Sequence, residues 1–144
     1  MSDDRPKIAV ADGGPYLVTG AVPLTTKTPI MSEHGEPLTW KTDEADRSRD
    51  RYALCRCGLS DNKPFCDGTH ARDGFDGTES APTDNFADRA DVYEGTRITM
   101  RDDRGICEHA GFCGNQQSNV WKMIASTDDT VVRSELMAMV ERCP

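Results

Sequence analysis

The sequence lacks long hydrophobic runs, has no excess of basic residues and contains few aromatic side chains. Its 144 residues include 17 Lys and Arg against 25 Asp and Glu, so the formal net charge is −8. No apolar run approaches the roughly 20 residues of a membrane-spanning helix. Nucleic acids and anionic membrane surfaces attract basic patches, so the acidic balance argues against both as partners. Residues 1–6 have neither a basic nor an apolar segment, so we expect no secretory signal.

The small number of large apolar side chains limits the core that this chain can form. Aromatic residues make up only 6% of the sequence and hydrophobic residues 36%. A chain of this length forms one ordinary domain or two small ones, and each half would then have a thin core. Six cysteines, by contrast, are many for such a chain, and they are the feature that needs an explanation.

The cysteines fall into two groups of three, and each group contains a nearby histidine. The groups are Cys55, Cys57 and Cys66 with His70, and Cys107, Cys113 and Cys143 with His109. Disulfides within each group would leave one thiol over, and no feature of the sequence directs the chain to an oxidising compartment. Thiolates beside imidazole in a reducing compartment such as the cytoplasm indicate metal or iron–sulfur ligands instead.

The hydrophobic pattern predicts a small α+β protein that is mostly β. Alternating polar and apolar residues between turn residues predict short strands, at 7–10, 16–18, 30–31, 38–40, 51–54, 96–100 and 119–124. Turn-forming residues at 80–85 indicate a linker. We therefore place a first domain at 6–80, a linker at 81–95 and a second domain at 96–144.

One helix is predicted from about residue 129 to 142. Apolar residues recur there with the spacing of one helical face, namely Val132, Leu136, Met139, Val140 and Cys143. Asp128, Asp129 or Thr130 can cap its N-terminus. We interpret this face as core, with Cys143 at its end.

The first cysteine group has the spacing C-x-C-x8-C-x3-H, from Cys55 to His70. Two cysteines at i and i+2 of an extended chain point to the same side, so both sulfurs can reach one metal. Asp67 is a good N-cap for a short helix that starts at Gly68. Such a helix would place His70 one turn from Cys66, and its free amides would stabilise a negatively charged cluster.

A single zinc ion is the alternative occupant of this site, since three cysteines and one histidine form a recognised zinc ligand set. Zinc sites usually use paired C-x2–4-C knuckles. C-x-C followed by a long loop is more typical of a binuclear centre, although the spacing leaves both occupants open.

The first group resembles the CDGSH iron–sulfur domain, whose name comes from the run that here reads C-D-G-T-H at residues 66–70. Thr69 stands where the family usually has Ser, and both side chains carry a hydroxyl. The resemblance extends through Ser60, Lys63 and Pro64, and more loosely over 6–80. It implies a small β-rich fold with little helix and a role in electron transfer, cluster transfer or redox sensing.

The resemblance implies a [2Fe–2S] cluster with Cys55 and Cys57 on one iron and with Cys66 and His70 on the other. It also implies supporting residues around the cluster, namely Asp67, Gly68, Lys63 and Pro64. A neutral imidazole in place of a thiolate removes a negative charge, which should raise the potential relative to four-cysteine ferredoxins. A histidine ligand can also be protonated near neutral pH, so we expect the cluster to become labile as the pH falls.

The second group reads C-x5-C from Cys107 to Cys113, followed at a distance by a Cys-Pro pair that starts at Cys143. Bacterial ferredoxins use C-x2-C-x2-C with a distant Cys-Pro, and Ala110 stands here where the middle cysteine would be. Three cysteines suffice for a [3Fe–4S] cluster, or for a [4Fe–4S] cluster with a different fourth ligand. The alternative is three reduced structural thiols, and His109 is more often a surface or packing residue than a ligand.

Residues 96–144 resemble the divergent single-cluster ferredoxin-like domain that occurs beside CDGSH motifs in bacterial proteins. Members of that family normally continue past the Cys-Pro with a further strand, and longer relatives carry a second CDGSH motif. The sequence stops at Pro144, so we expect a domain that is truncated at its C-terminal end.

Together these features predict an iron–sulfur protein that carries electrons or clusters and is not an enzyme. The alternatives are a zinc-binding structural or interaction module with the same ligands, and a subunit or regulator of a larger oxidoreductase. The expected partner is a protein that accepts electrons or clusters, and the CDGSH resemblance implies a homodimer for chains with one motif. Trp40 and Trp121 are interpreted as core or satellite hydrophobic residues rather than as parts of an electron path.

Overall fold

The structure is a computed structural model that describes residues 5–144. The prediction that residues 1–6 contain no secretory signal therefore lies mostly outside the described residues. The chain divides into two compact units. The first contains the residues up to Thr26 together with Asp43–Ala81, and the second contains Lys27–Thr42 together with Pro82–Pro144. The chain therefore contributes a segment to the second unit before it has completed the first.

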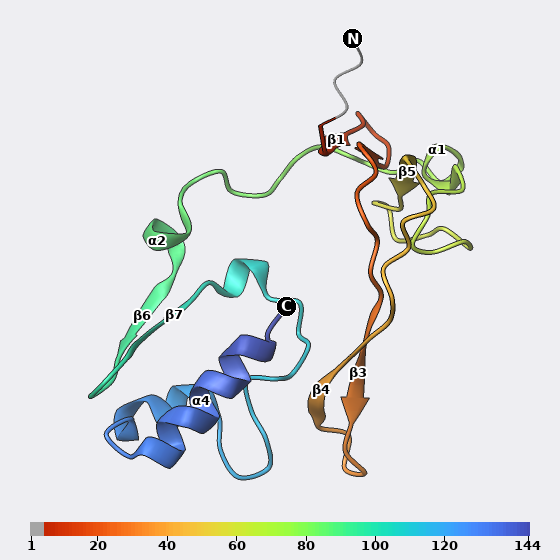
Figure 1. The fold of residues 1–144 in the computed structure, drawn as a ribbon. Helices are drawn as coiled ribbons and strands as arrows, with labels where there is room; N and C mark the ends of the chain where they lie inside the picture. The colour runs from red at the N-terminus through yellow and green to blue at the C-terminus, as the bar shows by residue number, and fades with distance from the viewer. Residues whose placement is uncertain (1–4) are drawn as a thin grey trace. The chain divides into compact units, whose positions relative to one another are not determined.

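A three-stranded antiparallel sheet forms the centre of the first unit (Figure 1). Its strands are β1 (Lys7–Val10), β2 (Tyr16–Thr19) and β5 (Arg51–Leu54), in the order β1-β2-β5. Val18 in β2 lies opposite Ile8 on one side and Tyr52 on the other. It is the only buried hydrophobic side chain among the described residues of this unit. The thin core predicted for this half is therefore confirmed.

Two β-hairpins and several helices form the second unit. The hairpins pair β3 (Lys27–Met31) with β4 (Pro37–Thr42) and β6 (Asp91–Glu94) with β7 (Thr99–Asp102). The helices are α2 (Phe86–Arg89), α3 (Val120–Met123) and α4 (Thr130–Arg142), with short 3-10 turns η1 (Arg104–Ile106) and η2 (Ile124–Ser126). The buried core consists of Met100, Val120, Met123, Ile124, Leu136 and Met139.

The fold class predicted from the sequence, a small α+β protein, is confirmed. The strands expected at 7–10, 16–18 and 51–54 are β1, β2 and β5, and those expected at 30–31 and 38–40 lie within β3 and β4. These segments were predictable because alternation and turn residues mark each of them locally.

The predicted helix is α4, and Asp129 is its N-cap. The Asp129 carboxylate accepts hydrogen bonds from two backbone amides of the first turn. Leu136 and Met139 of the predicted apolar face are buried. Cys143 lies just beyond the helix as its C-cap and is exposed, so the face does not extend to it as core.

The strand predicted at 119–124 is wrong, because these residues form α3 and the first residue of η2. Val120, Met123 and Ile124 have the i, i+3, i+4 spacing of a helix, and all three are buried. Asn119 caps the helix by accepting a hydrogen bond from a backbone amide of the first turn. A short apolar run fits either periodicity, and packing against the core selected the helix.

The strand predicted at 96–100 is shifted in the structure to β7, because the residues before it form the turn of a hairpin. Gly95 N donates a hydrogen bond to Ile98 O at 2.9 Å in that turn. The partner strand β6 and helix α2 both lie within 81–95, where the sequence indicated a linker. Both elements follow closely on the turn-forming residues at 80–85, and those residues favoured a linker there.

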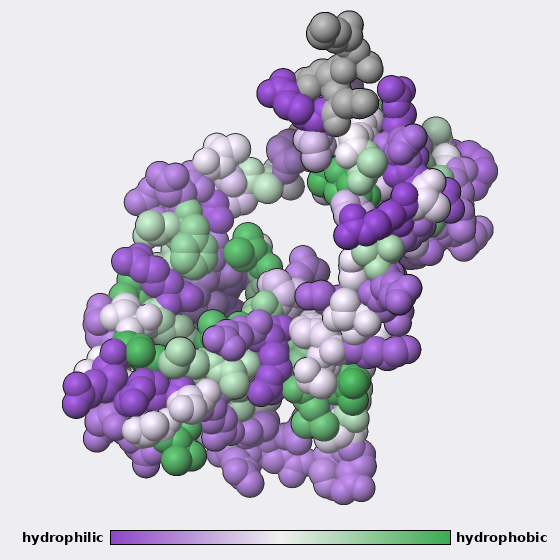
Figure 2. All heavy atoms as spheres, in the orientation of Figure 1, coloured by the Kyte–Doolittle hydropathy of each residue, from purple (hydrophilic) through white to green (hydrophobic). Residues whose placement is uncertain are grey.

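Hydrophilic side chains predominate on the face shown in Figure 2, and hydrophobic ones form small separate groups. Among residues 5–144, every helix is too short or too polar to cross a membrane.

Candidate metal centres

Strand β5 leads directly into the first cysteine group, and the chain then folds back beside it. Cys55 N donates a hydrogen bond to Pro64 O at 2.8 Å, and Cys66 N donates one to Ala53 O at 2.9 Å. These antiparallel contacts bring the two ends of the intervening loop together. The loop therefore presents ligands from both of its ends at the edge of the three-stranded sheet.

A buried serine holds this loop in shape. Ser60 Oγ donates a hydrogen bond to Phe65 O at 2.6 Å and accepts one from Asn62 N at 3.0 Å. Lys63 and Pro64, two of the predicted supporting residues, lie exposed between these contacts. Hydrogen bonds from one buried side chain thus organise the loop.

Asp67, another predicted supporting residue, joins the loop to helix α1 (Thr69–Arg72). Its carboxylate accepts hydrogen bonds from Thr69 N at 3.0 Å and from Asp61 N at 2.9 Å. Because these bonds, chiefly that from Thr69, favour the charged form, the pKa of Asp67 lies far below its ordinary value. The N-cap of α1 is Gly68, so the prediction of a helix that starts at Gly68 is off by one residue.

The four predicted ligands of the first centre lie in two pairs. Cys55 Sγ and Cys57 Sγ are 3.7 Å apart, and Cys66 Sγ and His70 Nδ1 are 3.4 Å apart. Two ligands of one tetrahedral metal, with bonds of about 2.3 Å to sulfur and about 2.1 Å to nitrogen, lie roughly 3.5–3.8 Å apart. Each pair therefore already has close to the spacing of two donors to one metal.

Backbone amides donate hydrogen bonds to a sulfur atom of each pair. Leu59 N donates to Cys57 Sγ at 3.5 Å, and Gly68 N donates to Cys66 Sγ at 3.4 Å. Gly68 adopts φ 87°, a left-handed conformation that favours glycine. Such hydrogen bonds stabilise thiolates and the negative charge of a bound cluster.

Backbone amides of the same loop also act on the thiol of Cys55. A backbone hydrogen bond from Ser60 is the main cause that lowers its pKa, and hydrogen bonds from Cys57, Gly58 and Leu59 act in the same direction. Lowering the pKa of a thiol increases the fraction of thiolate, which is the form that binds metals. The turn after β5 thus prepares Cys55 as a ligand.

Arg56, which lies between the first two cysteines, anchors the centre to the rest of the first unit. Its Nε donates a hydrogen bond to Gly14 O at 2.9 Å, and its Nη2 donates one to Gly77 O at 2.9 Å. The guanidinium also lies 5.2 Å from the ring centre of Phe75 and 5.9 Å from that of Tyr16. This role of Arg56 was not predicted from the sequence, where its position between two proposed ligands was the only signal.

The three cysteines of the second group line one cavity of about 320 Å³ in the second unit. Cys107 and Cys113 are half-buried, whereas Cys143 is exposed overall. Partial burial of its thiol raises the pKa of Cys143, and the nearby charges of Cys113 and Cys107 raise it further. The structure therefore brings the three predicted ligands together, although Cys143 lies far from the others in the sequence.

His109 also lines this cavity and is exposed, as expected for a surface residue. Its backbone adopts φ 54°, which is uncommon for a residue other than glycine. In this conformation His109 N donates a hydrogen bond to Cys107 Sγ at 3.4 Å. The backbone of His109 thus contributes to the cysteine loop, which consists of residues 107–119 between η1 and α3.

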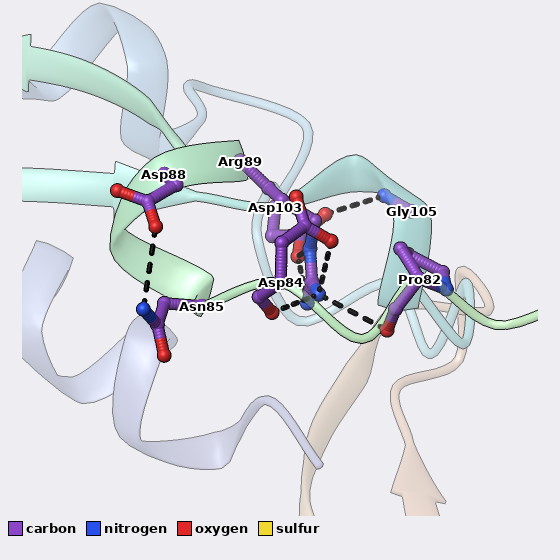
Figure 3. Close-up of polar contacts among 7 residues, drawn as sticks. All are labelled: Pro82, Asp84, Asn85, Asp88, Arg89, Asp103 and Gly105. Carbon is purple, nitrogen blue, oxygen red and sulfur yellow. Dashed lines mark hydrogen bonds and ion pairs between the residues drawn. The ribbon is translucent and has the colours of Figure 1, made fainter.

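An ion pair supports the start of the cysteine loop (Figure 3). Arg89 Nη2 in α2 lies 2.7 Å from Asp103 Oδ2, and the Asp103 side chain is only 6% exposed. The hydrogen bond from Arg89 is the main cause that lowers the pKa of Asp103. Asp103 also caps η1 by accepting a hydrogen bond from Gly105 N at 2.9 Å. Because η1 ends one residue before Cys107, this pair fixes where the loop begins.

The six cysteines form no disulfides among the described residues. Within the described part of the chain, no three His, Cys, Asp or Glu side chains are arranged around the position of a single metal ion. The donors lie instead as the two pairs of the first centre and around the cavity of the second.

Comparison with protein families also separates the two groups of donors. Residues 13–71 match the model of the iron-binding zinc finger of CDGSH type, and residues 93–144 match that of the divergent 4Fe-4S mono-cluster. No curated protein matches the chain. The first match contains all four donors of the first centre, and the second contains the three cysteines around the cavity. The chain is therefore an iron–sulfur protein with a CDGSH-type iron-binding domain followed by a divergent 4Fe–4S mono-cluster domain.

Proposed function

We propose that the first centre holds a [2Fe–2S] cluster on Cys55, Cys57, Cys66 and His70, and that the protein carries electrons or clusters without being an enzyme. The pairing of the donors, at 3.7 Å and 3.4 Å, is the observation that supports this most directly. Two pairs suit a centre with two metals, each bound by one pair. A single zinc ion would need all four donors around one point.

The bound cluster supplies a one-electron redox centre, and the surrounding residues set its potential. His70 brings no negative charge to the cluster, and the amides of Leu59 and Gly68 donate hydrogen bonds to ligand sulfurs. Both effects favour the reduced, more negative state. We therefore place the potential above that of ferredoxins with four cysteine ligands.

The cavity supports a second cluster on Cys107, Cys113 and Cys143. Three thiolates would hold a [3Fe–4S] cluster, or a [4Fe–4S] cluster with a fourth ligand other than cysteine. The convergence of these three side chains on one cavity favours a cluster over three separate structural thiols.

The proposed partner is a protein that exchanges electrons or clusters with this one. The net charge of −8 suits a basic docking face on that partner. Six free cysteines suit a reducing compartment, so we propose a cytoplasmic location. A homodimer remains our proposal for the oligomeric state.

The metal content of the purified protein tests this proposal. We expect a red-brown protein with visible absorption and with iron and sulfide in excess of one [2Fe–2S] cluster per chain. A colourless protein that contains zinc would contradict the proposal and support the zinc-binding alternative.

Paired substitutions then separate the two centres. Cys107→Ser should lower the iron content to the two atoms of the first centre and leave its visible spectrum unchanged. Cys66→Ser should remove that spectrum and leave the second cluster, so each variant is the control for the other. If the iron content of Cys107→Ser equals that of the wild type, the second cluster is contradicted and only the first cluster is supported.

A further inference from the structure

The β3–β4 hairpin lies within the CDGSH match along the sequence, but it belongs to the second unit in the structure. Trp40 in β4 contacts residues of the second unit that lie outside the hairpin. Its ring centre lies 4.9 Å from that of Phe112 at an interplanar angle of 40°, and Phe112 is only 3% exposed. Trp40 Nε1 donates a hydrogen bond to Arg142 O at 2.7 Å.

Both contacts of Trp40 lie next to proposed cluster ligands. Phe112 directly precedes Cys113, and Arg142 directly precedes Cys143. One side chain of the hairpin therefore reaches two ligand-bearing segments that are far apart in the sequence.

The hairpin makes two more contacts with the cysteine loop, one from its turn and one from the first residue of β4. Glu36 Oε1 accepts a hydrogen bond from Gln116 N at 2.5 Å. A side chain at Gly111 would meet Pro37 Cγ at 3.3 Å, so the Pro37 ring lies close against the backbone of Gly111. The hairpin thus contacts the cysteine loop on both sides of Cys113.

The end of α4 needs such support for a physical reason. The last carbonyls of a helix have no intrahelical partner and fray unless another group binds them. Trp40 supplies a donor to one of these carbonyls, at Arg142, while Cys143 N donates to Val140 O at 3.1 Å. An aromatic ring has few rotatable bonds, so it fixes this segment at a low entropic cost.

We propose that Trp40 is a positioning residue for the second cluster, and that the β3–β4 hairpin holds Cys113 and Cys143 at the spacing which that cluster needs. This inference rests on the proposed second cluster. It makes the second cluster domain discontinuous, built from Lys27–Thr42 as well as from Pro82–Pro144.

Two substitutions in the full-length protein as purified test this proposal. Trp40→Ala should remove most of the iron of the second cluster while the visible spectrum of the first cluster persists. Trp40→Phe keeps the ring but removes the hydrogen bond to Arg142 O. It should retain the second cluster with a shifted reduction potential and altered electron paramagnetic resonance. Leu38→Ala, also in β4 and at a side chain that is 48% exposed, is the matched control and should behave as the wild type.

Amide hydrogen exchange supplies a readout that does not depend on iron. The amide of Cys143 donates to Val140 O, and that of Val120 donates to Cys113 O at 3.0 Å, so these two amides report on the two ligand segments. Both should exchange faster in Trp40→Ala, and that of Cys143 should also do so in Trp40→Phe. Wild-type exchange and a wild-type resonance spectrum in Trp40→Phe would overturn the proposal, even if Trp40→Ala fails to fold.

The two proposals fail in different ways. A wild-type protein without second-cluster iron would contradict the proposed function, and amide exchange would still decide whether Trp40 positions the cysteines. A wild-type protein that holds the cluster, with Trp40 variants that hold it unchanged, would overturn only the role of Trp40.

Discussion

The two units of this protein are stabilised in different ways. In the first, Val18 is the only buried hydrophobic side chain among the described residues, and polar groups such as Ser60 and Arg56 hold the ligand loop. In the second, a contiguous apolar core centres on Leu136. Burial of one side chain contributes far less than the conformational entropy lost by ordering tens of residues. We therefore expect a bound metal to have a structural role in the first unit and mainly a functional role in the second.

Removal of iron should have the largest effect and should separate the units. Metal binding that organises a thin-cored domain is coupled to its folding, so chelation should unfold the first unit and leave the core of the second. We expect the amide of Cys66, which donates to Ala53 O, to lose protection while that of Leu136 in α4 keeps it. If the iron-free protein keeps its native near-UV circular dichroism and both amides stay protected, the metal does not stabilise the first unit.

Truncation of a core side chain should instead destabilise the second unit and leave the first unit intact. Leu136 is 2% exposed, so Leu136→Ala should destabilise the second unit by about 2–5 kcal/mol in urea unfolding. Val131→Ala in the same helix, at a side chain that is 74% exposed, should change stability by less than about 0.5 kcal/mol. We expect the visible spectrum of the first centre to survive both changes. Its loss in Leu136→Ala would show that the two units unfold together.

Replacement of the histidine ligand should change the first centre without removing it. His70→Cys adds a negative charge, so the reduction potential should fall, and the cluster should be lost more slowly as the pH is lowered. Redox titration and the rate of visible absorbance loss measure these effects. His34→Cys, at an exposed turn position, is the matched control and should behave as the wild type. Equal rates of acid decay in His70→Cys and the wild type would refute this role of His70.

The smallest effect is expected at Asp67. Its folded-state pKa lies below the ordinary value of 3.8 because Thr69 N and Asp61 N donate to its charged form. The unfolded chain therefore binds the proton more readily, and the stabilisation is complete above about pH 4 and is lost as the pH falls further. Asp67→Asn should lower the melting temperature at neutral pH, and the difference from the wild type should shrink toward pH 3. A difference that does not depend on pH would count against this origin.

The parts of the fold that were predictable from the sequence are those with local signals. Asp129 caps α4 because its carboxylate bonds to the amides that follow it, and the apolar spacing of Leu136 and Met139 needs no distant partner. The misassigned segment at 119–124 shows the limit of such signals. Its short apolar run is compatible with a strand or a helix, and only contact with the core decides between them.

The same limit applies to the two centres. The spacing from Cys55 to His70 predicted the first ligand set because all four donors lie on one short loop. Neither the support from Arg56 nor the Arg89–Asp103 pair was visible, since their partners are distant in the sequence. Trp40 was correctly interpreted as a packing residue, but its neighbours were not predictable.

The sequence by itself determined the class of this protein and predicted a donor set for its first centre, because ligand spacing along a short loop is a local property. Only the tertiary structure decided that Cys107, Cys113 and Cys143 share one cavity and that the β3–β4 hairpin packs beside them. Packing contacts between distant segments depend on shape and on the balance of all competing contacts, and no short pattern of residues encodes that balance.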